Sequence, residues 1–358
     1  MDYLDDVETV EEYDGYYYSV PDAPGIVILG LLCGFKNVRQ IHQWATNGRT
    51  RAFLRAEFGI ERIPCYYWLL TLLAMARPES LGECFTRWGE SILPGRGGAR
   101  TVALDGKSVR SSLRRPSPLH VVSALVAESG LTLAQEAVGD RSNEIPAVRR
   151  LVALLDLEGC VVTADAMHCQ RGTARAVRAG GADYLLCAKE NQRALRDGIR
   201  DYVRDGALRR GMARADTVEK GHGRVEERTA FVSHDVSWMP QRGEWRDLAC
   251  FGAVRSRRTI DGETSEEWRY YISSRLMDAD EFLSRVRLEW SVESMHWLLD
   301  VHYGEDGSRI LDRTAQRNLN ILRKSALSCI RVYRDGSGTR KPLSGIMLDC
   351  LLDNDVLV

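Results

Sequence analysis

Residues 101–105 read Thr-Val-Ala-Leu-Asp, and residues 161–165 read Val-Val-Thr-Ala-Asp. In both segments a short apolar run, typical of a buried strand, ends at an aspartate. An aspartate in this position usually begins a turn. Here Gly-Lys-Ser follows Asp105 and Ala-Met-His follows Asp165, and neither sequence indicates a tight hairpin. The two segments therefore predict two buried strands, each with a carboxylate at its end.

The segments around these strands predict one mixed sheet. Strands are expected at 101–105, 120–127, 131–138, 161–164 and 183–188, and helices at 145–157, 170–179 and 191–203. Three antiparallel strands followed by alternating helices and strands describe an α/β fold of the ribonuclease-H-like type. In that topology the first and fourth strands are neighbours. Asp105 and Asp165 are therefore expected to lie close together.

Changes in pattern along the chain predict six segments. They are an acidic leader (1–23), a helical N-terminal domain (24–96), the first part of the core (97–206), a β-rich insertion with short alternating segments (207–274), the rest of the core with basic helices (275–334), and a tail (335–358). The helical N-terminal domain could read DNA through a helix-turn-helix, or serve for dimerisation or packing. Five of its aromatic residues are expected in the core, namely Trp44, Tyr66, Tyr67, Trp68 and Trp88.

Charge is distributed unevenly along the 358 residues. The chain has 49 basic and 50 acidic residues, yet residues 1–14 contain seven acids and no base. Residues 307–341 contain nine Lys/Arg and two acids. This distribution indicates a surface that meets phosphates, and a solvated basic helix is the alternative.

The composition is that of a globular protein, with 44% hydrophobic and 28% charged residues. The nine cysteines form no Cys-x-x-Cys pair, which indicates reduced thiols in the cytoplasm. The longest nearly apolar run, 63–76, is too short to span a bilayer. We therefore expect a cytoplasmic protein.

The segment 280–301 is predicted to be one helix with acids on one face. Residues at i, i+4, i+7 and i+11 share that face, namely Glu289, Glu293, His296 and Asp300. The apolar stripe on the other side is expected to comprise Trp290, Trp297, Leu298 and Val301. Acids this close together repel one another unless a cation lies among them. With the two strand-end aspartates, Glu293 would complete a set of oxygen ligands for divalent metal ions.

Six motifs occur along the chain in an order that resembles a known family. They are Leu104-Asp-Gly-Lys-Ser-Val-Arg110, Ser142-Asn-Glu-Ile-Pro146, Thr163-Ala-Asp-Ala-Met-His168 with Gln170, Asp183-Tyr-Leu185 with Lys189 and Asn191-Gln192, His222-Gly-Arg-Val-Glu226, and His296-Trp-Leu-Leu-Asp-Val301 with Glu305-Asp306, Asn318-Leu319 and Leu322-Arg323. In this order they resemble the DDE transposases of bacterial insertion sequences, in the branch that includes the H-repeat-associated proteins. The resemblance covers nearly the whole chain.

The resemblance implies a metal-dependent enzyme that cleaves and joins DNA at the ends of a mobile element. Two Mg²⁺ or Mn²⁺ ions would be held by Asp105, Asp165 and Glu293. Many relatives have His or Arg where this chain has Glu289, and Asn where it has Ser294. Glu289 and Asp300 therefore stay open as alternatives for the helix acid.

Further residues are expected to support this site or to contact DNA. Candidates for holding phosphates near the acids are Lys107, Lys189 and Arg224, and candidates for supporting the acids are His168 and His296. The basic helices contribute Arg309, Arg313, Arg317, Arg323 and Lys324 as DNA contacts. Double-stranded DNA is the expected partner, bound by a homodimer or higher oligomer. Two other functions remain open, a DNA-binding protein derived from a transposase and a metal-dependent nuclease without strand transfer.

Overall fold

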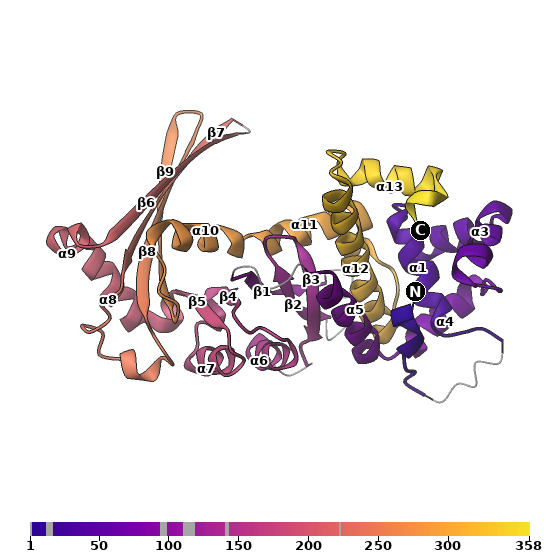
Figure 1. Ribbon diagram of the computed structural model, residues 1–358, viewed down its shortest axis with the longest axis horizontal. Coiled ribbons are helices and arrows are strands. Elements are labelled where there is room, and N and C mark those ends of the chain that lie inside the picture. Colours follow the sequence, from indigo (N-terminus) through magenta and orange to yellow (C-terminus); the bar gives the residue numbers. More distant parts are fainter. Residues whose placement is uncertain (1, 12–16, 94–98, 110–118, 140–142, 222) are drawn as a thin grey trace. The chain divides into compact units, whose positions relative to one another are not determined.

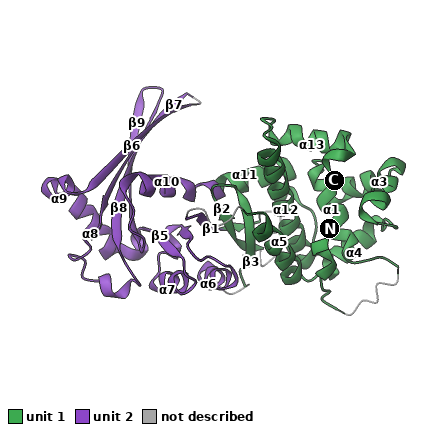
Figure 2. Ribbon diagram, viewed as in Figure 1, with its two compact units in different colours: residues 1–95, 106–142, 293–358 green, residues 96–105, 143–292 purple. Residues whose placement is uncertain are grey.

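The computed structural model describes residues 2–11, 17–93, 99–109, 119–139, 143–221 and 223–358. The chain forms two compact units (Figure 2), of which unit 1 comprises residues 1–95, 106–142 and 293–358 and unit 2 comprises residues 96–105 and 143–292. These units cut across the domain boundaries predicted from the sequence, because the N-terminal helices pack with the last helices of the chain. Across the described ranges, no helix combines the length and the apolar character that a membrane span requires.

Unit 2 is built on strands that follow one another in a single sheet (Figure 1). Their order is β1 (Thr101–Ser108), β4 (Val161–Ala164), β5 (Asp183–Ala188), β9 (Glu263–Ser273), β8 (Cys250–Ile260), β7 (Arg224–Ser233) and β6 (Ala213–Gly221). The pairs β1–β4 and β4–β5 are parallel, and the later pairs are antiparallel. The helices of this unit are α6 (Glu144–Leu154), α7 (Arg171–Ala179), α8 (Arg193–Arg204), α9 (Gly206–Arg210) and α10 (Ala279–Glu289).

Unit 1 is mainly helical. It contains α1 (Asp22–Leu32), α2 (Val38–Ala45), α3 (Gly48–Phe58), α4 (Tyr66–Met75), α5 (Pro78–Ile92), α12 (Arg313–Ser337) and α13 (Leu343–Leu352), together with most of α11 (Ser291–Tyr303). Its strands β2 (His120–Val126) and β3 (Leu131–Ala137) pair antiparallel, and β2 lies beside β1, whose last residues belong to this unit. Helix α12 packs against α1, α4, α5 and β3. Asn318 on α12 donates 2.7 Å hydrogen bonds to the carbonyls of both Leu73 and Ala76, where α4 ends.

Short 3-10 helices complete the described secondary structure. They are η1 (Asp2–Asp6), η3 (Ala166–His168), η4 (Glu190–Gln192), η5 (Arg242–Glu244), η6 (Glu305–Gly307) and η7 (Asn354–Val356).

The strand order confirms the predicted fold class. The first five strands follow the order β3-β2-β1-β4-β5, with β1 directly beside β4, as the ribonuclease-H-like topology requires. The insertion is β-rich as predicted, and it also contains β6 at 213–221, a strand that the sequence pattern did not indicate. It is not a separate sheet, because β9 pairs with β5 and extends the core sheet.

The prediction of one helix over 280–301 is wrong. The helix is interrupted at Trp290, whose N–H bonds to the carbonyl of Arg287, three residues back, and a new helix starts at Ser291. The buried residues of α11 are Val292, Met295, Leu299 and Tyr303, while Trp297 is 61% exposed. Apolar residues lie all round α11, so its sequence left the choice of buried face to the packing partners.

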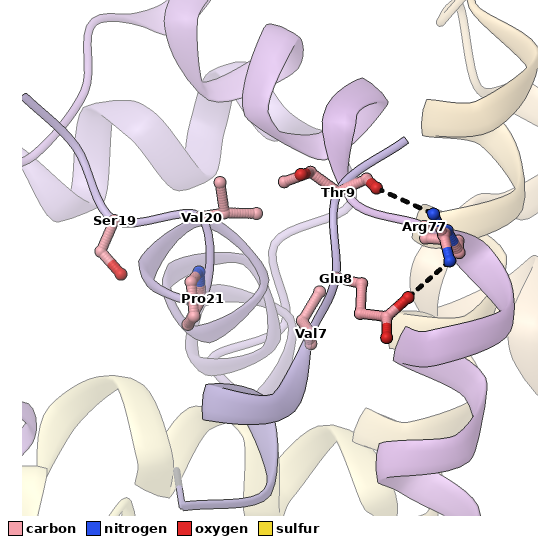
Figure 3. Close-up of a pocket in the computed structure, with 7 residues that line it drawn as sticks. All are labelled: Val7, Glu8, Thr9, Ser19, Val20, Pro21 and Arg77. Atoms are coloured by element: carbon pink, nitrogen blue, oxygen red, sulfur yellow. Dashed lines mark hydrogen bonds and ion pairs between the residues drawn. The ribbon is translucent and has the colours of Figure 1, made fainter. Parts of the chain in front are cut away.

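The described part of the acidic leader is held by contacts within unit 1. The carboxylate of Asp6 lies 2.7 Å from Arg87 and that of Glu8 lies 2.5 Å from Arg77. The N–H of Val10 donates to the carbonyl of Met75. Figure 3 shows the Glu8–Arg77 pair at the edge of a cavity of about 580 Å³ between the leader and the start of α1. The leader is therefore held by cations of its own chain.

Candidate active site

The aspartates Asp105 and Asp165 are brought together in unit 2 by the register of two parallel strands. Leu104 pairs with Ala164, so Asp105, which lies within β1, stands beside Asp165, which directly follows the end of β4. The side chain of Asp165 is 52% exposed. Burial raises its pKa, the His168 imidazole opposes this, and the charges of Asp105 and Glu144 raise it further. The two aspartates thus form an accessible site rich in negative charge at the end of β4, although β1 continues past Asp105 to Ser108 and does not end there as predicted.

A third carboxylate, Glu289 at the end of α10, lies within the electrostatic reach of this pair. Burial raises the pKa of Glu289 to about 8. The cations of Arg269 and Lys189 lower it, whereas Asp165 and Asp105 raise it. Its buried Oε2 atom has no hydrogen-bond partner in the described part of the chain. The alternative helix acid is therefore the one that unit 2 places near both aspartates.

The aspartate Asp165 has a buried support in His168. The Nε2 atom of His168, a residue with no exposed surface, lies 3.1 Å from Glu144 and 3.6 Å from Asp165. Sequence reasoning did not select Glu144, although it is part of the Ser142-Asn-Glu-Ile-Pro146 motif. The Asn143 side chain caps α6 by accepting from the N–H of Ile145 and so places Glu144 in the first turn. The motif therefore places the residue that contacts His168.

The Asn191-Gln192 motif holds the turn that follows Asp165. The Asn191 amide donates a 2.6 Å hydrogen bond to the carbonyl of Ala166, and the Gln192 amide donates a 3.0 Å bond to that of Cys169. Both side chains follow the end of β5. They constrain the backbone next to the aspartate, which is a structural reason for this motif.

Of the predicted helix residues, Glu293, His296 and Asp300 belong to unit 1. Glu293 is exposed in the first turn of α11. Glu289 ends α10 and Glu293 lies in the first turn of α11, so the two acids belong to separate helices and not to one helix as the sequence predicted.

The Lys107 side chain is enclosed by acids of unit 1. Its Nζ atom lies 3.0 Å from Asp300, 2.7 Å from Glu305 and 3.9 Å from Asp306. Ligand atoms of these three carboxylates lie within 4.8 Å of one another and could hold a cation. The ammonium of Lys107 already contacts all three. Lys107 is thus part of an ion-pair cluster, and this position does not favour the predicted phosphate contact.

Two of the predicted DNA contacts conflict with the structure. Arg323 and Lys324 are each 3% exposed. The Lys324 ammonium donates to Ser123 (2.7 Å) and Gln135 (2.6 Å), and burial lowers the pKa of Arg323. They face the interior of unit 1 because α12 is buried along most of this stretch. Neither can reach a phosphate from this position.

The remaining predicted cations are accessible. Arg309, Lys189 and Arg224 are exposed and Arg313 and Arg317 are partly exposed. Arg317 pairs with Glu79 at 2.7 Å, and Arg224 with Glu226 at 2.9 Å. The motif residues Arg110, Ser142 and His222 lie outside the described residues.

Comparisons with known proteins agree on one family. A family model described as "Transposase DDE domain" matches residues 96–329. An "Uncharacterized protein in dhlA 3'region" of Xanthobacter autotrophicus is 33% identical over 73% of this chain and 89% of its own length. "Putative transposase YncI" of Escherichia coli O157:H7 is 36% identical over 66% of this chain and 63% of its own. "H repeat-associated putative transposase YhhI" of Escherichia coli K12 is 30% identical over 76% of each chain.

Proposed function

Because the chain belongs to the transposase DDE-domain family, we propose that it cleaves DNA at the ends of a mobile element and joins the freed strand to a target. Asp105, Asp165 and Glu293 are the proposed catalytic acids. The observation that carries this proposal is the register of β1 and β4, which brings Asp105 and Asp165 to one edge of the sheet.

The residues at this edge suit the divalent metal ions that the family uses. Carboxylate oxygens are the preferred ligands of Mg²⁺ and Mn²⁺. Burial raises the pKa of Asp165, the charge of Asp105 raises it further, and a bound cation would offset both effects. Two ions held there would activate a water or a 3′-hydroxyl and stabilise the leaving oxygen. Glu293 is the proposed third ligand, and Glu289 is the alternative because of its charge coupling to both aspartates.

Other residues of the chain support this chemistry by position. His168, held by Glu144, orients the Asp165 carboxylate, and Asn191 holds the turn beside it. Lys189 is exposed and couples to Glu289, which makes it the favoured candidate for holding a phosphate near the acids.

Duplex DNA is the proposed partner of the N-terminal helices. Helices α2 and α3 are joined by Thr46 and Asn47 alone, and the Asn47 side chain caps α3. A short connection between two helices is also a feature of the helix-turn-helix. Arg49, Arg51 and Arg55 are exposed on α3. We propose that this helix contacts the element ends, with the chain acting as a dimer or higher oligomer in the bacterial cytoplasm.

One assay tests this function. The purified protein is incubated with Mg²⁺ and linear DNA that carries the element's flanking ends, and nicked and joined products are separated on a denaturing gel. Both products are expected, and Asp105→Ala, Asp165→Ala or chelation of the metal should reduce them to background. Nicked products alone would indicate a nuclease. Binding without either product would indicate a DNA-binding protein.

A further inference from the structure

Helix α4 exposes aromatic rings that its sequence places among core residues. The buried side of α4 comprises Leu69, Leu72 and Leu73. On the other side Tyr67 is 75% exposed and Trp68 is 44% exposed. The expectation that these two rings belong to the core is therefore wrong. Soluble proteins rarely expose large apolar groups side by side, and where they do, the patch commonly marks an interaction site.

Further aromatic rings extend this exposed region. Tyr66 lies edge-on to Tyr67, with ring centroids 5.4 Å apart, and Trp68 lies 6.2 Å from Tyr18. Tyr17, which directly precedes Tyr18 in the chain, is 62% exposed. The rings come from α4 and from the segment before α1, so that two distant parts of the sequence contribute to one surface of unit 1.

Cations lie over two of these rings. The Arg39 guanidinium lies 4.4 Å from the centroid of Tyr66, and that of Arg62 lies 4.9 Å from Tyr17. In the described part of the chain neither guanidinium is paired with a carboxylate. Residues 36–62 contain six Lys/Arg and two acids. We define the aromatic–cationic surface as Tyr17, Tyr66, Tyr67, Trp68, Arg39 and Arg62.

We propose that the aromatic–cationic surface binds unpaired nucleotides of single-stranded DNA. The positive charge selects a polyanion, and the exposed rings select bases whose flat faces are free to stack. In a blunt duplex those faces are covered by neighbouring base pairs, so a duplex could use the arginines but not the rings. The proposal rests on the proposed function for the choice of DNA, since a chain that cleaves element ends meets unpaired strands at its substrate.

Anisotropy measurements with the full-length protein in EDTA test this proposal, because the proposed cleavage requires a metal ion. The probes are a labelled single strand of about 12 nucleotides, the blunt duplex of the same sequence, and that duplex with an unpaired end. The variant Tyr67→Ala/Trp68→Ala should bind the single strand about 10- to 100-fold more weakly and the blunt duplex within about twofold of the parent. The same variant should again bind more weakly than the parent when the probe is the duplex with an unpaired end.

Two controls separate stacking from folding. Tyr67→Phe/Trp68→Phe keeps flat rings and should retain single-strand binding within about threefold. Tyr333→Ala removes a tyrosine of α12 that is 40% exposed and should change nothing.

Arg39→Ala/Arg62→Ala should lower the salt slope of single-strand binding by about 0.7 for each phosphate that the variant no longer neutralises.

Three results would overturn the proposal. The first is an unchanged single-strand affinity in Tyr67→Ala/Trp68→Ala, and the second is an equal loss of affinity for the blunt duplex in the same variant. The third is conversion of an oligomer to monomers by this variant, measured by sedimentation, which would make the surface a contact between copies of the chain. The proposed function fails separately, through cleavage that survives Asp105→Ala, and single-strand binding in EDTA is measured independently of that result.

Discussion

The ammonium of Lys107 lies 2.7 Å from Oε2 of Glu305, a carboxylate with no exposed surface. Asn320 donates a 2.6 Å hydrogen bond to the other oxygen of Glu305. Lys107 stands two residues after Asp105 on β1, and its second partner Asp300 stands seven residues after Glu293 on α11. Within unit 1 the cluster thus joins the end of the strand that carries one proposed catalytic acid to the helix that carries another.

Lys107→Met should destabilise the protein. Removing one partner of a buried ion pair leaves an unpaired charge and costs about 3–5 kcal/mol. The matched control is Lys341→Met, which breaks an exposed pair with Asp349 at the same 2.7 Å distance and should cost less than about 1 kcal/mol. Urea unfolding measures both. Equal losses in the two variants would show that burial adds nothing to the Lys107 pair.

The same pair should make stability depend on acidity. Burial raises the pKa of Glu305, but the Lys324 and Lys107 cations outweigh it and hold the pKa below its ordinary value. A group with a depressed folded pKa contributes stability above its unfolded pKa, and this contribution is lost as pH falls through the folded pKa. Unfolding midpoints of the parent should therefore fall at acidic pH more steeply than those of Lys107→Met/Glu305→Gln. Parallel pH profiles would contradict this.

The identity of the helix acid can be decided by parallel substitution. If Glu293 is the third ligand, Glu293→Ala should abolish Mg²⁺-dependent cleavage while leaving DNA binding intact. Glu289→Ala, which removes a buried carboxyl, should then retain measurable cleavage. Activity that survives in Glu293→Ala and disappears in Glu289→Ala would transfer the role to Glu289. Thermal unfolding of both variants distinguishes lost chemistry from lost fold.

The basic stretch 307–341 should contact DNA only through its accessible arginines. Arg309→Ala/Arg313→Ala/Arg317→Ala should flatten the salt dependence of duplex binding by about 0.9 for each phosphate left without its cation. Arg323→Ala is the internal comparison, because its 3% exposed side chain should affect stability and leave the slope unchanged. A slope that responds to Arg323→Ala would show that α12 moves when DNA binds.

The acidic leader should compete with DNA for two arginines. Asp6→Asn/Glu8→Gln would release Arg87 and Arg77, and affinity for random duplex DNA should rise at low salt. The gain should shrink as salt screens the charges. Asp2→Asn, an exposed leader acid, is the control. Equal affinities of parent and double variant at every salt concentration would assign the leader a packing role alone.

The leader also bears on α1 through Asp22. Burial and the nearby charge of Asp5 raise the pKa of Asp22 to about 6. Because the pKa of Asp22 is higher in the folded protein than in the unfolded chain, ionising Asp22 lowers the free energy of unfolding. This loss develops as pH rises from about 4 to 6. Asp22→Asn should thus stabilise the protein at pH 7 by about 1 kcal/mol, discounted for partial exposure, with little effect near pH 3.5. A loss of stability at pH 7 would contradict this.

The sequence by itself determined the strands of the core and their order. Short apolar runs before Asp105 and Asp165 predicted two buried strands, and the order of strands and helices predicted β1 beside β4, as the pairing of Leu104 with Ala164 confirms. The motif around Glu144 was visible as well, but its contact with His168 was not, since 24 residues separate them.

Only the tertiary structure decided which way ambiguous side chains face. Helices α4 and α11 carry apolar groups on every side, so their sequences allowed several buried faces, and packing buried Leu69 and Met295 while it exposed Tyr67 and Trp297. Arg323 and Lys324 resemble surface cations in the sequence. They became interior residues because hydrogen-bond partners distant in the chain were available, namely Ser123 and Gln135 for Lys324 and the carbonyl of Lys36 for Arg323. Local pattern predicts an element, whereas the orientation of its side chains depends on partners that only the folded chain brings near.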